Sequence, residues 1–109
     1  MAALTTAVMP LTGGAIAYTA AAGGGDTCQT GAGVLLLVKN GDASEHTVTM
    51  VTPGTVNGLA IADRPIPVAA GAVVGIPVNQ DYRNPSTGRA SITYDAVTSL
   101  EVAVVRVPV

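Results

Sequence analysis

Turn-forming residues interrupt this chain so often that no long helix fits between them. Glycine and proline supply 20 of the 109 residues, about 18% against roughly 12% in an average protein. The turn signals recur roughly every 8 to 12 residues, a spacing typical of an all-β sandwich or barrel. The sequence therefore predicts an all-β fold, a small antiparallel β-sandwich or jelly-roll-like barrel with an extended N-terminal arm. We expect one β domain over residues 1–109, with a Gly/Ala-rich arm and first strands in 1–30 and the main sandwich in 31–109.

The first half of the sandwich begins with residues 33–39 (GVLLLVK), a continuous apolar run typical of a strand buried on both faces. The turn signal Asn40-Gly41-Asp42 follows, and residues 46–51 then alternate between apolar and polar, with Val48 and Met50 on one face. Together these two runs predict a hairpin. In the N-terminal segment, weaker patterns indicate short strands within residues 4–9 and 15–19.

Two runs in the middle of the chain carry strand breakers. Residues 55–61 are predicted as one strand with a bulge or bend at Gly58. Residues 64–68 contain Pro65 and Pro67, which cannot donate to a ladder, so we expect an edge strand or an extended connection there. The apolar run 72–76 is the next predicted strand.

The last two predicted strands differ in how many faces are apolar. Residues 89–94 alternate, which places Ala90, Ile92 and Tyr94 inward. Residues 99–107 have Leu100, Val102 and Val104 for the core. Their opposite face is also apolar, at Ala103, Val105 and Val107. Such a strand is either central in its sheet or covered by a partner, and both alternatives stay open here.

Charged residues are scarce, and this limits the possible partners. The twelve charged residues make 11% of the chain, against roughly 25% in an ordinary soluble domain. Either neutral polar side chains cover much of the surface, or another protein does. A net charge of −2 with only five basic residues gives no footprint for nucleic acid or anionic lipid. The uncharged stretches are broken by Gly, Pro or Thr, so we expect no membrane span.

The first 25 residues are Ala-rich and hold small residues at plausible signal-peptide cleavage positions. They contain no Lys or Arg, and Pro10, Gly13 and Gly14 interrupt any apolar core, so we interpret them as part of the mature protein. The single cysteine, Cys28, cannot form an internal disulfide. This fits assembly in a reducing cytoplasm.

Few residues could carry catalysis, so we expect no enzyme, metal site or cofactor. Cys28 lies in a loop-like segment with no basic neighbour to activate it. His46 is predicted to be a solvated hairpin residue without a second histidine for a metal. The aspartates all lie at or next to predicted turns, which explains them without a function. A calcium site built from several loops stays open, although no EF-hand spacing is present.

Residues 34–107 carry four motifs: LLLVKNG, TVTMVTPGTVNGLAIADRPIPVAAGAVVGIPV, GRASITY and SLEVAVVRV. These motifs resemble the head decoration, or cement, proteins that tailed bacteriophages encode beside the major capsid protein. The resemblance implies a structural virion protein that binds the outer capsid surface and strengthens the shell, often as a homotrimer at three-fold and quasi-three-fold positions. It implies the major capsid protein as partner, synthesis in the host cytoplasm, and no catalytic residues.

Apolar residues without an obvious place in a minimal sandwich are our candidates for capsid or inter-subunit contact. We expect the N-terminal arm to contact the shell or a neighbouring copy, and the outward face of the last strand to pack against a partner. The candidates are Leu4, Val8, Met9, Leu11, Ala103, Val105 and Val107. The alternative for each is that it completes the protein's own core. A tail or connector role, and an adhesion or ligand-binding role, are the competing functions, although only three tyrosines could form an aromatic binding face.

Overall fold

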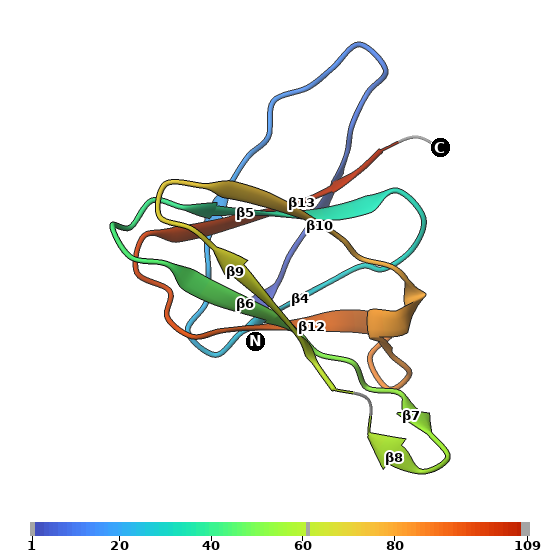
Figure 1. The fold of residues 1–109 in the computed structure, drawn as a ribbon. Helices are drawn as coiled ribbons and strands as arrows, with labels where there is room; N and C mark the ends of the chain where they lie inside the picture. The colour runs from blue at the N-terminus through green and yellow to red at the C-terminus, as the bar shows by residue number, and fades with distance from the viewer. Residues whose placement is uncertain (1, 61, 108–109) are drawn as a thin grey trace.

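A computed structural model describes residues 2–60 and 62–107 of the chain. The described residues are nearly all β, with one 3₁₀ turn, η1 (Gln80–Tyr82), and no α-helix. Figure 1 shows two antiparallel-rich sheets lying one above the other, an arrangement compatible with a β-sandwich. The sequence prediction of an all-β fold is confirmed.

The first sheet is built around the strand β12 (Arg89–Tyr94), which pairs with three others. The order across the sheet is β1 (Ala2–Ala3), β4 (Asp26–Cys28), β12, β6 (His46–Met50) and β9 (Arg64–Val68). A short β11 (Arg83–Asn84) also pairs with β12. As expected from its two prolines, β9 lies at the edge of this sheet.

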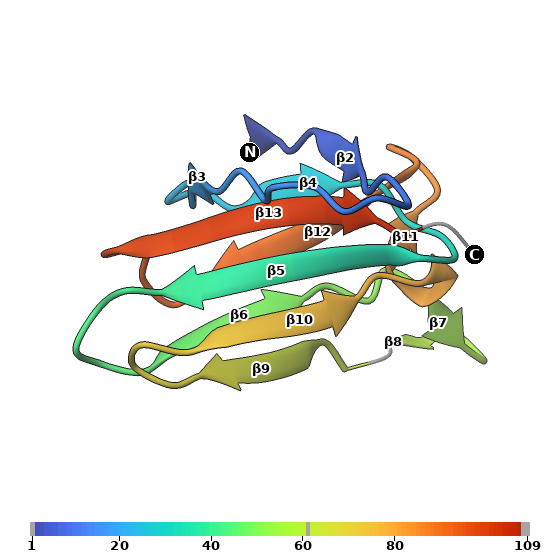
Figure 2. The same ribbon diagram turned by 90° about the horizontal axis from the view of Figure 1, so that it is seen from above.

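The second sheet is built around the long pair β5 (Val34–Asn40) and β13 (Leu100–Arg106), whose register runs from Leu100 opposite Asn40 to Arg106 opposite Val34. β10 (Val73–Pro77) forms the other neighbour of β5. Along its free side, β13 is joined by β2 (Thr6–Val8) in parallel and by β3 (Thr19–Ala20) in antiparallel orientation. Figure 2, which looks down on this sheet, shows β13 and β5 side by side at its centre.

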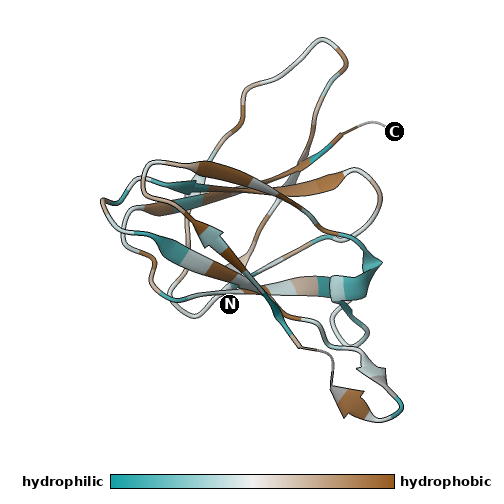
Figure 3. Ribbon diagram, viewed as in Figure 1, coloured by the Kyte–Doolittle hydropathy of each residue, from teal (hydrophilic) through white to brown (hydrophobic). Residues whose placement is uncertain are grey.

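The core between the sheets consists of small, mostly β-branched side chains. Inward rows from both sheets are buried, and they include Val34, Leu36, Val38, Val48, Met50, Ala90, Ile92, Leu100, Val102 and Val104. The inward faces predicted for residues 46–51, 89–94 and 99–107 are therefore confirmed. Valine suits a pleated surface because its branched side chain packs closely against neighbouring strands. In Figure 3 the brown of apolar residues follows β5, β10 and β13.

The predicted hairpin between residues 33–39 and 46–51 is wrong. β5 belongs to the second sheet and β6 to the first, so the connection between them crosses from one layer to the other. The side chain of Asn40, only 1% exposed, holds this crossing by donating to the carbonyl groups of Ser44 (2.9 Å) and Val68 (3.0 Å). The face of β5 that lies opposite the core is also less buried than predicted, since Leu35 and Leu37 are half-buried and Lys39 is exposed.

Residues 55–61 do not form the single strand that the sequence predicts. They form a small hairpin of β7 (Thr55–Val56) and β8 (Leu59–Ala60), and Ile61 lies outside the described residues. Asn57 and Gly58 make its two-residue turn with φ angles of 52° and 77°. Asn-Gly with positive φ at both positions is the pattern of a type I′ hairpin turn. The hairpin projects from one side of the molecule in Figure 1.

The N-terminal segment contributes strands to both sheets before it leaves them. β1 pairs with β4 of the first sheet, and β2 pairs with β13 of the second. The part that projects is the stretch between β2 and β3, residues 9–18, drawn in blue at the top of Figure 1. We call this stretch the 9–18 loop. An extended N-terminal arm is therefore not confirmed, because the loop is tied to β13 at both ends.

Candidate functional site

Cys28 is buried in β4, in place of the loop that the sequence predicts, and its side chain has 0% exposure. Burial raises the pKa of its thiol to about 11, while Arg89 acts to lower the pKa and Asp26 acts to raise it. A thiol in this environment is almost entirely protonated at neutral pH and is a poor nucleophile. The geometry gives Cys28 a packing role.

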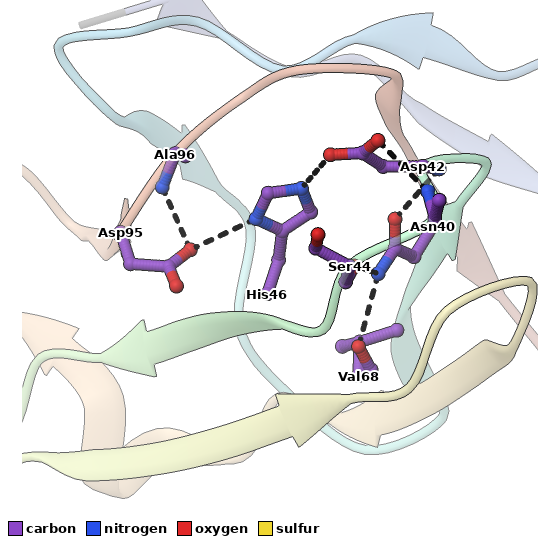
Figure 4. A network of polar contacts seen from close by, with 8 residues as sticks. Asn40, Asp42, Ser44, His46, Val68, Asp95 and Ala96 are labelled. Carbon is purple, nitrogen blue, oxygen red and sulfur yellow. Dashed lines mark hydrogen bonds and ion pairs between the residues drawn. The ribbon is translucent and has the colours of Figure 1, made fainter.

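His46 is buried, with 6% exposure, so the prediction of a solvated residue is wrong. Its ring lies between two carboxylates (Figure 4), with Nε2 2.9 Å from Asp42 Oδ2 and Nδ1 3.4 Å from Asp95 Oδ1. Asp42 belongs to the connection between β5 and β6, and Asp95 directly follows β12. The ring therefore joins two connections at one end of the sandwich.

The two carboxylates beside His46 are stabilised in their charged form. The backbone amide of Ala43 and the ring of His46 lower the pKa of Asp42. Desolvation acts to raise the pKa of Asp95, but hydrogen bonds from backbone amides of Thr47 and Ala96 and the nearby His46 outweigh it, so this pKa is also lowered. Hydrogen bonds to a charged carboxylate are the usual cause of such a shift. The arrangement is that of a structural clasp.

Asp26 forms the second buried polar contact, between β4 and β12. The hydroxyl of Tyr94 donates to its Oδ2 at 2.6 Å, and the amide of Ala22 donates to the same oxygen at 3.3 Å. Burial and the Asp26 carboxylate raise the pKa of Tyr94 well above its ordinary value. Asp26 Oδ1 is buried and finds no hydrogen-bond partner in the described part of the chain. Asp26 thus fastens two strands from the start of β4, directly after the turn that the Gly25 amide closes on the Ala22 carbonyl.

Other site types find little support in the described residues. Among residues 2–60 and 62–107, no cluster of three or more His, Cys, Asp or Glu side chains is arranged to hold a metal. No helix in that part of the chain has the length and apolar character needed to cross a bilayer. Tyr82 is buried, Tyr94 is half-buried, and the half-buried Tyr18 has the Lys39 ammonium 5.6 Å from its ring centroid. The tyrosines therefore do not form one open aromatic face.

The most distinctive surface is the 9–18 loop together with the end of β2. Three of the six exposed large apolar side chains in the described part of the chain lie here: Leu11 (93% exposed), Val8 (68%) and Ile16 (40%). The loop is held at its base, where the amide of Met9 donates to the Arg106 carbonyl (2.9 Å) and Thr19 Oγ1 donates to the Val102 carbonyl (3.4 Å). No charged residue occurs among residues 1–25. Exposed apolar side chains on one projecting, uncharged segment make this surface the candidate contact site.

The seven predicted contact residues fall into two groups. Val8, Met9 and Leu11 lie along the base and tip of the 9–18 loop, and Val107 (43% exposed) lies just beyond β13. Leu4, Ala103 and Val105 instead line a hollow of about 320 Å³ between β13 and the N-terminal segment. Ala103 and Val105 are only 7% and 4% exposed, so the chain itself covers this face of β13. Contact of any of the seven residues with a partner stays a prediction.

Sequence reasoning missed three other exposed apolar residues. Ile16 belongs to the 9–18 loop, Leu59 (73% exposed) projects on the β7–β8 hairpin, and Val73 (53%) lies on the outer face of β10. The dipeptide Gly13-Gly14 ends two residues before Ile16. The dipeptide Asn57-Gly58 directly precedes Leu59. Those turn signals could have indicated that the next apolar residue stands on a projecting turn.

Comparisons of the chain with models of protein families, with curated proteins and with solved structures find no match.

Proposed function

We propose that this protein is a structural, non-enzymatic component of a phage virion that binds the outer surface of the capsid and stabilises it. The observation that carries the proposal is the 9–18 loop, an uncharged projecting segment with a 93% exposed leucine near its tip. We also propose that the two sheets form a jelly-roll-like sandwich, and that the loop takes the role expected of an N-terminal arm.

The scarcity of charge suits a protein that covers another protein surface. A standard interface takes about 800 Å² from each partner, or about one-eighth of the 5991 Å² exposed here. Burying a charge without a partner costs several kcal/mol. A partner can cover the end of β2 and the 9–18 loop without burying a charged side chain, because none occurs between residues 1 and 25. Repeated contacts of this kind around a shell would resist outward pressure together.

Within this surface, we assign the shell contact to the base of the 9–18 loop, at Val8 and Met9. Val8 is 68% exposed although it ends a strand that is paired with β13. A partner at this position would meet a rigid backbone, because the Met9 amide is bonded to the Arg106 carbonyl. A rigid contact surface loses less conformational entropy on binding.

The test measures co-sedimentation of the purified protein with undecorated phage heads. The wild-type protein should bind saturably, and Val8→Asp should weaken binding about tenfold or more, since full burial of a valine contributes about 1.5–3 kcal/mol. An aspartate at position 8 would lie beside Arg106 in the register, so the fold should tolerate it. This variant is cleaner than deletion of residues 1–10, which would remove β1 and β2 from the two sheets.

Leu59→Asp is the matched control, because Leu59 is equally prominent on a different projection of the molecule. Its binding to heads should equal that of the wild type. No binding of the wild-type protein to heads would contradict the proposed function. Loss of binding in Leu59→Asp with full binding in Val8→Asp would instead move the contact to the β7–β8 hairpin. Recovery of the protein only with tails or connectors, or on a host glycan, would favour the competing functions.

A further inference from the structure

One edge of the second sheet ends at β10. In the described part of the chain, β5 is the only strand that pairs with β10. At the two ends of this pair, the amide of Val78 donates to the Val34 carbonyl and the amide of Asn40 donates to the Ala72 carbonyl, both at 3.0 Å. The backbone groups of an antiparallel strand point alternately toward its partner and away from it. The even-numbered residues of β10 therefore bond to β5.

The odd-numbered residues of β10 direct their backbone groups away from the sheet. Val73 and Gly75 each offer an N–H and a C=O there, and Pro77 offers a C=O alone. Val73 is 53% exposed, and the other two residues are also exposed. Groups that recur at every second residue of an extended strand match the backbone of another extended strand. The free edge of β10 is therefore a template for one further strand.

The corresponding edge of the first sheet, at β9, offers no such template. Pro65 and Pro67 of β9 have no N–H, so the bonds from β9 to β6 come from the residues between them and the prolines face the free side. Proline on an edge strand is a common protection against the addition of a further strand. β10 has no proline before its last residue, and no charged residue occurs in 65–80. The protection is therefore confined to β9.

A hollow of about 240 Å³ lies between these two edge strands. Figure 2 shows β10 and β9 along the same side of the sandwich. Ile66 of β9 and Val74 and Ile76 of β10 contribute apolar surface to the hollow. Apolar cavities of about 150 Å³ are known to hold benzene-sized groups. Since side chains alternate along a strand, every second side chain of a strand added to β10 would face this hollow.

The hollow has a cation at the C-terminal end of β10. Arg64 lines it there, together with Asn79 and Tyr82, which follow β10 in the chain. The guanidinium carbon of Arg64 lies 5.9 Å from the centroid of the Tyr82 ring. Among the described residues Arg64 forms no ion pair, not even with Asp81, which lines the adjoining hollow. A guanidinium pairs best with a carboxylate, so an acidic residue in the added strand would complement this end.

We propose that β10 binds an extended segment of a partner protein, which adds to the second sheet as an antiparallel strand with apolar side chains in the hollow and an acidic residue beside Arg64. Main-chain hydrogen bonds would give affinity, and the side chains in the hollow would give specificity. A second copy of β10 fits less well, because antiparallel pairing about Gly75 sets Pro77, which has no N–H, opposite Val73. The inference does not depend on the capsid role, since β2 and the 9–18 loop lie at the opposite edge of this sheet.

Nuclear magnetic resonance titration with a synthetic peptide tests the proposal. The probe is Ac-Asp-Thr-Val-Thr-Val-Thr-amide, in which Asp and both Val residues share the face toward the hollow. It should bind saturably with a dissociation constant below about 1 mM. The amide signals of Val73 and Gly75 should shift the most, and these amides should become protected from hydrogen exchange.

N-methylation of the probe tests the direction of its hydrogen bonds with the unaltered protein. In an antiparallel pair, residues directly opposite one another have side chains on the same face. The Thr residues of the probe would therefore lie opposite Val73 and Gly75 and donate to β10. N-methylation of the central Thr should weaken binding about fivefold or more, whereas N-methylation of the first Val should leave it unchanged.

Two protein variants test the edge and the cation. Gly75→Pro removes one outward N–H, as the prolines of β9 do, and should weaken binding about fivefold or more. Gly75→Ala is the matched control, because it keeps the N–H and its Cβ meets Leu35 and Leu37 only at ordinary contact distances of 3.5 Å. Replacing Asp of the probe by Asn should weaken binding about threefold to the wild type and leave binding to Arg64→Gln unchanged.

Three results would overturn the inference. The first is no binding of the probe to the wild type at about 1 mM, and the second is equal binding of the two N-methylated probes. The third is self-association of the wild type that Gly75→Pro abolishes and Gly75→Ala retains, because a second copy would then occupy the edge of β10.

Discussion

At the scale of single residues, buried polar side chains act as fasteners in a molecule with few charges. His46 joins two connections through Asp42 and Asp95, and Asp26 joins β4 to β12 through Tyr94. The contacts of His46 with Asp95 and of Tyr94 with Asp26 link segments that lie far apart in the sequence, whereas the contact of His46 with Asp42 is local. A core of small aliphatic side chains does little to determine which strands and connections pack against one another. The few buried polar contacts add that specificity.

The His46 clasp predicts an acid-dependent loss of stability. Asp42 and Asp95 have lowered pKa values in the folded protein and return to about 3.9 in the unfolded chain. Stability from these two groups is therefore fully present above that unfolded pKa and is lost as pH falls through the folded pKa values. In thermal unfolding between pH 7 and pH 2, His46→Gln should flatten the decline in melting temperature below pH 4.

Glu45→Gln provides the control for the clasp, since Glu45 is an exposed carboxylate beside His46 in the sequence. Its acid profile should follow the wild type. Identical profiles for the wild type and His46→Gln would show that the clasp adds nothing to acid stability.

The sequence alone does not favour His46 or Cys28 as a catalytic residue. The environment that it predicts for each of the two side chains is nevertheless wrong. His46 was expected in solvent because it follows a turn signal, and it is buried because the turn crosses between layers. Cys28 was expected in a loop, although it ends the three-residue strand β4. A strand of three residues leaves too short a pattern for periodicity to detect.

At the scale of elements, the positions of the longer strands could be predicted and their partners could not. β6, β9, β10, β12 and β13 each match a predicted run to within two residues at either end. Alternation reports which face of a strand is buried, but not which strand lies beside it. The hairpin prediction failed for this reason, because Asn40-Gly41-Asp42 begins a crossing between sheets. At Asn57-Gly58 the sequence predicts only a bulge or bend at Gly58, whereas the chain forms a two-residue hairpin there.

The crossing after β5 gives a prediction about Asn40. Its side-chain amide donates to two carbonyls, and its Oδ1 accepts from the Asp42 amide at 2.9 Å. Asn40→Ala should lower the free energy of unfolding by about 2–4 kcal/mol, because it leaves buried polar groups without partners. Urea denaturation measures the change.

Asn79→Ala is the matched control for Asn40. Asn79 makes the same local contact, with its Oδ1 accepting from the Asp81 amide at 3.0 Å, but it is exposed. We expect a loss of about 0.5–1 kcal/mol there, since water replaces the bond. Equal losses in the two variants would contradict the role given to Asn40 in the crossing.

At the scale of the whole molecule, two kinds of uncharged side chain take the place of charged ones at the surface. The 5991 Å² surface carries twelve charged residues, or about 500 Å² for each, roughly twice the area in an ordinary domain. Half-buried threonines on β6 and β12 supply neutral polar surface. Exposed apolar side chains supply another part, and three of the six large ones, Val8, Leu11 and Ile16, lie at the end of β2 and on the 9–18 loop. This division could not be predicted, because burial of Ala103 and Val105 depends on how the N-terminal segment returns to β13.

We propose that the protein covers the outside of a phage capsid, and imaging of particles is a direct test of this role. Electron cryomicroscopy of undecorated heads mixed with the purified protein should show added density on the outer capsid surface, repeated at every equivalent position of the lattice. Leu59→Asp should give the same density, and Val8→Asp should lose most of it. Density confined to a single vertex, to the tail, or absent from the shell would contradict the claim.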